Sequence, residues 1–151
     1  MAISDDYILG LVVGEGSFTF STTKFVSRKT GETINRRIPA FMLQMHERDE
    51  ALVRLVRDHL RLPNKIYIFR RPALVTNKKI YQRGRLAVLT VREIGSLKNI
   101  IMPFFANRLI GYKANQFREW IELIGEDNAV PESYKIIYRL YNLRFGSRGL
   151  L

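Results

Sequence analysis

A short run near the N-terminus combines two glycines and an acid at a spacing that could serve chemistry. Gly10 and Gly14 are four residues apart in an expected helix, so one helix face has no side chains and another backbone could approach it closely. Leu9 and Val13 flank this face with apolar groups. Glu15 then falls at the helix C-terminus, where the helix dipole disfavours an acid by about 0.3–1 kcal/mol. A hard cation would neutralise both the carboxylate and the terminal carbonyls, and oxygen ligands without His or Cys suit Mg²⁺.

The same residues also allow a plainer interpretation, a glycine-capped helix end followed by an exposed Glu15. Composition excludes several other kinds of site. The chain has no Cys and two His, which excludes disulfides, thiolate catalysis, Cys-based metal sites and a multi-histidine site within one chain. Neither a phosphate-cradling glycine loop nor a nucleophile–base pair is evident, so a metabolic enzyme is disfavoured.

Charge is the most informative feature of the composition. The 151 residues include 25 Lys and Arg against 14 Asp and Glu, a formal net charge of +11. A folded domain this basic repels itself and predicts an anionic partner, with nucleic acid favoured over an anionic membrane.

Length and hydropathy bound the class of protein. With 46% hydrophobic and 26% charged residues, the chain has a globular composition. No stretch approaches the roughly 20 apolar residues that span a bilayer, so no membrane association is expected. The start of the chain lacks the basic and long apolar segments of a signal peptide. We therefore expect a single domain over residues 1–151 in an intracellular protein, either cytoplasmic or organellar.

Helical and strand periods alternate along the chain. The expected helices cover residues 5–13, 49–60, 92–105 (interrupted at Pro103), 112–124 and 132–143. The expected strands cover residues 17–23, 36–45, 65–71 and 79–91, with a turn at 28–32 and a loop containing Pro72 and Asn77. Gly14–Gly16 should end the first helix, and Pro39 indicates a strand edge or end. The order predicts an α+β fold with one four-stranded antiparallel sheet, helices on one of its faces and extra C-terminal helices.

The opposite face of that sheet is expected to be free of helices. Alternation places Phe18 and Phe20 in the core and leaves polar, basic and aromatic side chains on the bare face. The residues expected there are Thr19, Ser21, Thr23, Arg36, Ile38, Tyr67, Phe69, Arg71, Arg83 and Arg85. The phase of the fourth strand stays open, because a bulge at Gly84 would reverse its alternation. Such a face could simply be solvated, but exposed aromatic residues among basic ones favour a ligand surface.

Residues 9–17, with the sequence LGLVVGEGS, resemble the signature of the LAGLIDADG homing endonucleases. Residues 39–49 resemble that family's second strand and the start of the next helix. Residues 102–105 and 111–117 resemble its segment with a basic active-site residue, and the element order resembles its αββαββα core. The resemblance implies a saddle-shaped sheet over the major groove of double-stranded DNA. It also implies an intron-encoded, sequence-specific endonuclease that makes a metal-dependent staggered cut in a long, roughly palindromic target.

The resemblance implies roles for individual residues as well. Because the signature occurs once, the active form should be a homodimer, whose two signature helices pack through Tyr7, Leu9, Gly10, Val13 and Gly14. Glu15 would bind the metal together with the Gly14 carbonyl; Mg²⁺ is expected, and Mn²⁺ or Ca²⁺ could occupy the same ligands. Lys113 matches the basic residue that polarises the phosphate or orients water. Gln44 is the nearest match to a catalytic glutamine of the second strand, although by simple count Met45 occupies that place.

The implied contacts with DNA divide into two kinds. Side chains on the bare sheet face would read base pairs in the major groove. Basic residues at its margins, such as Arg28 in the expected turn, would hold phosphates.

Two other functions remain open at this point. A family member that binds nucleic acid without cutting it, such as an intron-splicing maturase, would keep the fold and would take RNA as a partner. Intact Glu15 and Lys113 favour cleavage over that alternative. A basic RNA- or ribosome-binding module with an open sheet is less favoured, since it gives no reason for the Gly10–Gly14–Glu15 arrangement.

Overall fold

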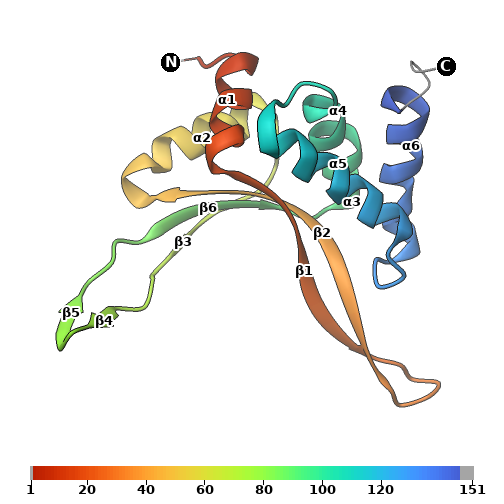
Figure 1. Cartoon of the computed structure of the whole chain (residues 1–151), viewed down its shortest axis with the longest axis horizontal. Coiled ribbons are helices and arrows are strands. Elements are labelled where there is room, and N and C mark those ends of the chain that lie inside the picture. Colours follow the sequence, from red (N-terminus) through yellow and green to blue (C-terminus); the bar gives the residue numbers. More distant parts are fainter. Residues whose placement is uncertain (1, 147–151) are drawn as a thin grey trace.

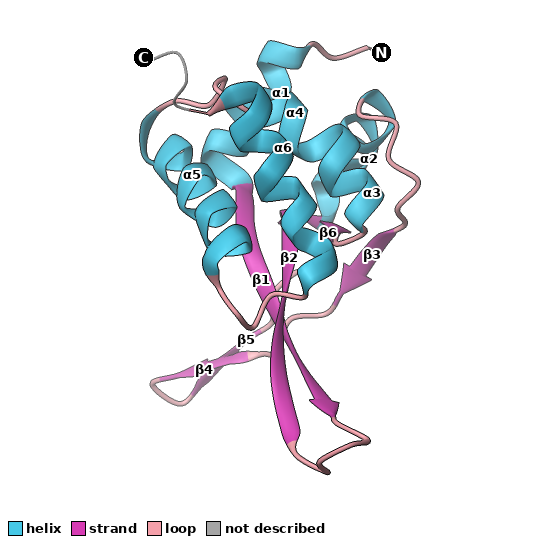
Figure 2. Cartoon of the chain, turned by 90° about the vertical axis from the view of Figure 1, so that its right-hand side faces the viewer, coloured by secondary structure: helices cyan, strands magenta, loops and turns pink. Residues whose placement is uncertain are grey.

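Helices and strands follow the order expected from the sequence patterns, except for two additional short strands within residues 74–81. A computed structural model describes residues 2–146. Its helices are α1 (Asp5–Glu15), α2 (Glu50–His59), α3 (Ile94–Ser96), α4 (Met102–Phe105), α5 (Gly111–Glu126) and α6 (Lys135–Phe145). Its strands are β1 (Gly16–Val26), β2 (Thr33–His46), β3 (Ile66–Phe69), β4 (Leu74–Thr76), β5 (Lys79–Tyr81) and β6 (Leu86–Val91). The helices form a layer over one face of the sheet, which confirms the α+β prediction (Figures 1 and 2).

The main sheet has four antiparallel strands in the order β1-β2-β6-β3. The pairing of β1 with β2 runs without a bulge from Gly16 opposite Leu43 to Val26 opposite Thr33. Strand β6 pairs with β2 only from Phe41 onward. Pro39 therefore lies where β2 has a neighbour on one side, a position in which a strand tolerates the missing N–H of proline.

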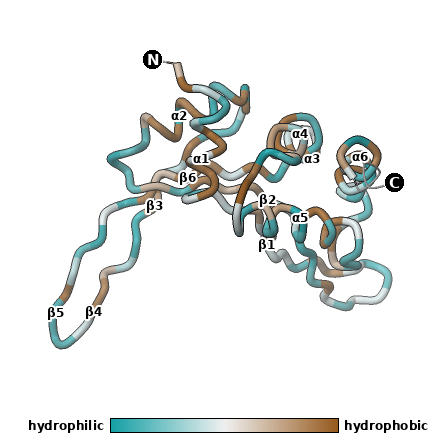
Figure 3. Tube along the Cα trace, turned by 45° about the horizontal axis from the view of Figure 1, so that its top comes forward, coloured by the Kyte–Doolittle hydropathy of each residue, from teal (hydrophilic) through white to brown (hydrophobic). Residues whose placement is uncertain are grey.

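Two hairpins extend from the sheet to the side away from the helices, so the sheet arches over a concave surface (Figures 1 and 2). One is the outer half of β1–β2, and the other is β4–β5. The expected strand over residues 79–91 is wrong in this respect, because it divides into β5 and β6, and the expected loop before it contains β4. Asn77 and Lys78 both have positive φ, as a tight two-residue hairpin turn requires. Figure 3 shows this hydrophilic tip, with short apolar stretches in β4 and β5 on either side of it.

An aromatic cluster joins the sheet to the helical layer. The Phe18 ring of β1 lies 5.0–5.5 Å, centroid to centroid, from the rings of Phe41, Phe105, Phe117 and Trp120. Because Phe18 and Phe41 are directly paired across β1 and β2, they mark the helix-facing side of the sheet. The residues that alternate with them must face the concave side.

The first helix is longer than the sequence pattern predicts. Its N-cap is Ser4, whose hydroxyl accepts the N–H of Tyr7 at 3.1 Å. The helix continues through Gly14 to Glu15, and it ends at Gly16, whose N–H donates to the Val12 carbonyl. The expected range 5–13 is thus two residues too short, whereas the expected position of Glu15 at the helix C-terminus is confirmed.

The expected interruption of the helix lies just before Pro103, where a π-helical segment over Leu97–Ile101 separates α3 from α4. The N–H of Met102 donates to the carbonyl of Leu97, which makes a wider turn before α4. Pro103 then lies in the first turn of α4, where a missing N–H leaves no bond unmade. None of the helices within residues 2–146 combines the length and the apolar content needed to cross a bilayer.

Candidate active site and nucleic-acid interface

Glu15 is exposed at the junction between α1 and β1. Within residues 2–146 it has no ion pair with Lys, Arg or His. The same part of the chain contains no group of three His, Asp or Glu side chains that could hold a metal ion. One copy therefore offers a single carboxylate here, beside the last carbonyls of α1, which have no partner within the helix.

Lys113 lies against the residue that follows Glu15. Its Nζ is 2.5 Å from the carbonyl oxygen of Gly16 and 3.2 Å from Oε1 of Gln116. The same amide oxygen accepts the N–H of Phe18 at 3.3 Å. The first turns of helix α5 are thus hydrogen-bonded to the start of β1. This contact places the Lys113 ammonium at the α1–β1 junction.

The register of the sheet places Gln44 and Met45 on opposite faces. Gln44 pairs with Val88 and is exposed on the concave side, whereas Met45 pairs with Ala87 and packs against the core. No bulge is needed for this arrangement. Because Gly16 pairs with Leu43, Gln44 adjoins the residue opposite the α1–β1 junction.

Eight of the residues expected on the bare sheet face and at the second strand lie on the concave side. Directly paired residues of antiparallel strands share a face, which groups the side chains across all four strands. The group consists of Thr19, Ser21, Thr23, Arg36, Ile38, Gln44, Tyr67 and Phe69. The Tyr67 and Phe69 rings are 6.3 Å apart, and each side chain is more than half exposed. The alternation of β6 is regular, since Gly84 lies before the strand begins.

Arg71, Arg83 and Arg85 do not alternate on strands as expected, because the chain leaves the main sheet at Phe69 and rejoins it at Leu86. The Arg71 Nε donates to the Gly84 carbonyl at 2.8 Å, and the Arg83 Nε donates to the Pro72 carbonyl at 2.9 Å. The Arg85 Nε lies 2.9 Å from a carboxylate oxygen of Glu47. These guanidinium groups brace the base of the β4–β5 hairpin.

The His46 ring packs so closely against residue 84, at the base of that hairpin, that only glycine fits there. A Cβ at this position would collide with the His46 imidazole. The glycine therefore permits contact between the hairpin base and the end of β2, and it does not mark a bulge. Arg28 lies in the exposed turn between β1 and β2, as expected.

The net charge is confined to the strands and their hairpins. Residues 16–46 and 65–91, which include all six strands, contain twelve Lys or Arg and a single acid, Glu32. The rest of the sequence contains thirteen basic and thirteen acidic residues. The whole formal charge of +11 thus belongs to the segments that form the concave surface, and the remainder is neutral.

Helix α1 has a second apolar face that its own domain leaves open. Ile8 and Val12 are buried beneath the helix, while Tyr7, on the other side, is 48% exposed. A Cβ added at Gly10 or Gly14 would meet nothing within 4 Å. A helix that is apolar on all sides is usually covered on all sides. Of the residues expected at a dimer interface, Leu9 lies at the flank of this face, since it also packs against the core.

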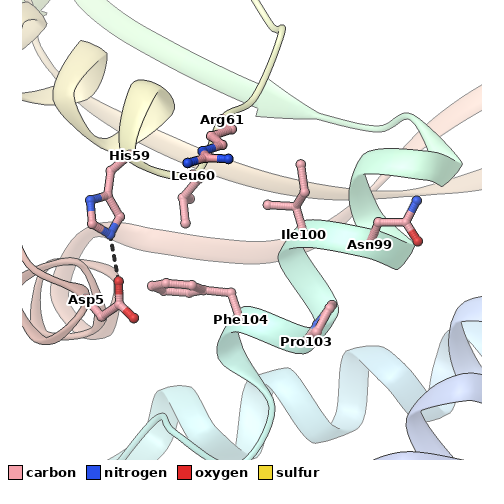
Figure 4. A pocket seen from close by; sticks show the side chains of 8 residues that line it. All are labelled: Asp5, His59, Leu60, Arg61, Asn99, Ile100, Pro103 and Phe104. Carbon is pink, nitrogen blue, oxygen red and sulfur yellow. Dashed lines mark hydrogen bonds and ion pairs between the residues drawn. The ribbon is translucent and has the colours of Figure 1, made fainter.

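The N-terminal end of α1 is tied to the helical layer (Figure 4). Asp5 Oδ1 lies 2.6 Å from Nε2 of His59 at the end of α2, and Oδ2 lies 3.2 Å from the Arg108 guanidinium. Hydrogen bonds from His59 first, then from Arg108, hold the pKa of Asp5 below its usual range. Asp5 and His59 line an open cavity of about 390 Å³ with Ile100 and Phe104. These contacts help to fix the direction of α1.

Comparison with protein-family models agrees with this geometry. The model described as LAGLIDADG endonuclease matches residues 8–124, from the first buried residue of α1 to the last buried residue of α5. The chain belongs to the LAGLIDADG endonuclease family. The family match includes α1 from Ile8 onward, all six strands and Lys113, whereas helix α6 lies beyond it. A search of curated proteins gave no match.

Solved structures of LAGLIDADG proteins share the fold. I-SmaMI bound to uncleaveable DNA is 25% identical with a TM-score of 0.62, and the match covers 97% of this chain and 46% of that one. I-CpaMI bound to uncleaved DNA is 17% identical with a TM-score of 0.64, covering 99% and 43%. The homing endonuclease I-TnaI is 20% identical with a TM-score of 0.59, covering 95% and 100%. This chain therefore spans less than half of the first two proteins and the full length of the third.

Gln116 is the residue of the candidate site that sequence reasoning missed. It is three residues after Lys113 and on the same helix face, so the spacing itself was a usable signal. Trp120, one further turn along, donates its indole N–H to the Thr19 carbonyl at 2.8 Å. Phe25 was missed because the first strand was expected to end at Thr23, whereas it continues to Val26.

Proposed function

We propose that this LAGLIDADG protein is a sequence-specific DNA endonuclease that acts as a homodimer and makes a metal-dependent staggered cut in a long, roughly palindromic site. The observation that supports this most directly is the contact of Lys113 with the carbonyl of Gly16, the residue next to Glu15 at the α1–β1 junction. An acid and an ammonium group at the margin of a basic concave sheet suit attack on a phosphodiester.

Binding of double-stranded DNA is supported by the distribution of charge. The segments that form the concave surface carry the whole net charge of +11, which attracts a polyanion, and phosphate contacts would position it. The exposed side chains on the concave sheet face would contact base edges, which differ for every base pair in the major groove. The exposed Arg28 would contact the phosphate backbone.

The proposed homodimer is supported by the small number of metal ligands that one copy provides. Glu15 is a single carboxylate, and a divalent cation usually binds several oxygen ligands. Two α1 helices packed through Tyr7, Gly10, Val13 and Gly14 would cover the open apolar face and bring the second Glu15 to the site.

Each residue would have a separate task in cleavage. The Glu15 carboxylate and the Gly14 carbonyl fit a hard divalent cation, with Mg²⁺ as the expected ion and Mn²⁺ or Ca²⁺ as substitutes. When bound, the cation supplies positive charge at the phosphodiester. Lys113 would stabilise negative charge on the phosphate, and Gln44 would orient a water molecule by hydrogen bonding from the concave face.

The function is tested by incubating the protein with a randomised duplex DNA library and Mg²⁺ and sequencing the cut ends. We expect staggered cuts within one roughly palindromic sequence. Glu15→Gln should bind that sequence with normal affinity and leave it uncut, because a neutral amide is a poor ligand for a hard cation.

A matched control is Glu126→Gln, which alters another exposed acid at the end of a helix and should cut normally. Cleavage by Glu15→Gln at the wild-type rate would refute the role of Glu15. Wild-type protein that binds RNA and cuts no member of the library would instead favour an intron-splicing maturase.

A further inference from the structure

Phe25 is an exposed aromatic residue in the outer part of the β1–β2 hairpin, and none of the contacts proposed above uses it. Its side chain is 41% exposed. The guanidinium carbon of Arg36 lies 4.0 Å from the centroid of the Phe25 ring. This is the distance of a cation–π contact between a planar cation and a ring face.

Both residues face the concave side. Thr23 is paired with Arg36 and Phe25 with Ile34, so Phe25 and Arg36 are diagonal neighbours on one face. Phe18 and Phe41 lie on the other face of the sheet, which the helices cover. The ring thus supports Arg36 from within the surface proposed to meet DNA.

We propose that Phe25 is a positioning residue that holds Arg36 for recognition of one G·C pair in each half-site, an inference that rests on the proposed DNA-binding function. A guanidinium stacked on an aromatic ring keeps its N–H edge free, and that edge can donate two hydrogen bonds to O6 and N7 of guanine. A free arginine loses side-chain entropy when it binds. Stacking before binding reduces that loss.

The next residue, Arg37, also stacks on an aromatic ring, but it serves to hold the hairpin against the helical layer. The Arg37 guanidinium lies 4.3 Å from the centroid of the Phe20 ring, but on the helix-facing side of the hairpin. Its NH1 donates to Asp127 at 2.5 Å, and its backbone N–H donates to the Ala129 carbonyl at 3.0 Å. Arg37 therefore forms an ion pair within the protein, whereas Arg36 has no ion pair among residues 2–146.

The test measures affinity for a panel of duplexes, each altered at one base pair of the selected target, in the Glu15→Gln background so that the DNA stays intact. Arg36→Ala should reduce the preference for guanine at one symmetric pair of positions by about 5- to 150-fold, the range of a bidentate arginine contact. Phe25→Leu should reduce it by about two- to fivefold, the range of an exposed cation–π contact. Affinity for duplexes that lack this guanine should not change.

Three further variants separate positioning from general structure. Phe25→Tyr keeps the ring and should restore the preference. Phe20→Leu removes the matched ring on the other side and should leave the preference intact. Phe25→Leu added to Arg36→Ala should cause no further loss, because the two residues act through one contact.

The outcomes separate this inference from the proposed function. If Phe25→Leu keeps the full guanine preference, or weakens binding to every duplex equally, Phe25 does not position Arg36. Wild-type protein that selects no duplex at all would overturn the proposed function and this inference together.

Discussion

Lys113 donates to the carbonyl of Gly16, the residue that follows Glu15, and this has two physical consequences. An acid at a helix C-terminus is unfavourable, and a cation nearby offsets part of that cost. The Lys113 ammonium donates to the Gly16 carbonyl, so it places positive charge at the end of α1 even without DNA. The same charge is then available to a phosphate that approaches Glu15.

Lys113→Met tests whether this charge assists cleavage. We expect the single-turnover cleavage rate to fall by about 10²-fold or more, with little change in DNA affinity, because the charge is needed most in the transition state. Rates at saturating enzyme and equilibrium binding on the same duplex give both quantities. Equal losses in binding and cleavage would show that Lys113 is a phosphate contact only.

Gln116→Leu is the informative companion to that variant. It removes the amide oxygen shared by Lys113 and the Phe18 N–H and leaves the lysine charge in place. We expect a smaller loss of cleavage and a loss of stability of about 1 kcal/mol from the unpaired N–H. Gln116→Glu keeps an acceptor oxygen and should restore the stability, whereas its carboxylate would offset the Lys113 charge and keep cleavage slow.

Among the elements, α1 has two apolar faces, of which one packs on its own core and the other is proposed to pack against a second copy. Ile8 and Val12 bind it to its own core, and the glycine face stays open. Asp5, at the other end from Glu15, fixes the helix through His59 and Arg108. A helix held at its first turn can present the acid at its last turn in a defined place.

Gly10→Leu tests the proposed seam between two α1 helices. The new side chain meets open space in one copy, so the fold should persist. In a dimer it would separate the two backbones at a cost of about 1–3 kcal/mol from each side chain. Light scattering should show dimers of the wild type and monomers of the variant.

Gly95→Leu, at an open glycine in α3, is the control and should remain dimeric. Wild-type protein that is monomeric both free and on DNA would rule out the homodimer.

The β1–β2 hairpin is attached to the helical layer by Asp127. Its pKa lies below the usual range, chiefly because the Ala129 N–H donates to it and also because Arg37 pairs with it. A depressed pKa in the folded state means that the ionised acid stabilises the fold above its ordinary pKa. That contribution is lost as the pH falls from about 4 through the folded-state pKa.

Asp127→Asn should therefore lower the free energy of unfolding at neutral pH by about 1 kcal/mol or less, since the ion pair is partly exposed. The difference between variant and wild type should shrink as the pH is lowered below about 4. Denaturant unfolding across this pH range measures it. A difference that stays constant with pH would show that the charge of Asp127 contributes nothing.

For the molecule as a whole, the separation of charge predicts how DNA binding depends on salt. Arg28 belongs to the charged hairpins, whereas Arg139 belongs to the neutral remainder and pairs with Glu132. Arg28→Ala should weaken binding evenly across DNA sequences and reduce the slope of log affinity against log salt by about one. Arg139→Ala should leave that slope unchanged. If both variants change the slope equally, the neutral helical layer also contacts DNA.

The sequence alone determined the order of elements, the side of β1 that enters the core, the basic character and the family resemblance. These properties are local or additive: period-two and helical patterns can be counted within one segment, and charge can be summed along a chain. Phe18, for instance, alternates with polar residues whatever lies beyond its strand. The concave placement of Thr19, Ser21 and Thr23 followed from the same alternation.

Only the tertiary structure decided where the chain leaves the sheet and which distant groups meet. Alternation could not show that Arg71 and Arg83 lie outside the strands, because the end of a strand depends on its partner's register. It could not show that β2 runs to His46 without a bulge, which places Gln44 on the concave side and Met45 against the core. The contact of Lys113 with Gly16, and that of Arg36 with Phe25, also depend on how elements pack and strands pair. The sequence indicates which side chains could take part in the site. The distances between them depend on strand pairing and helix packing between distant segments, which no local pattern predicts.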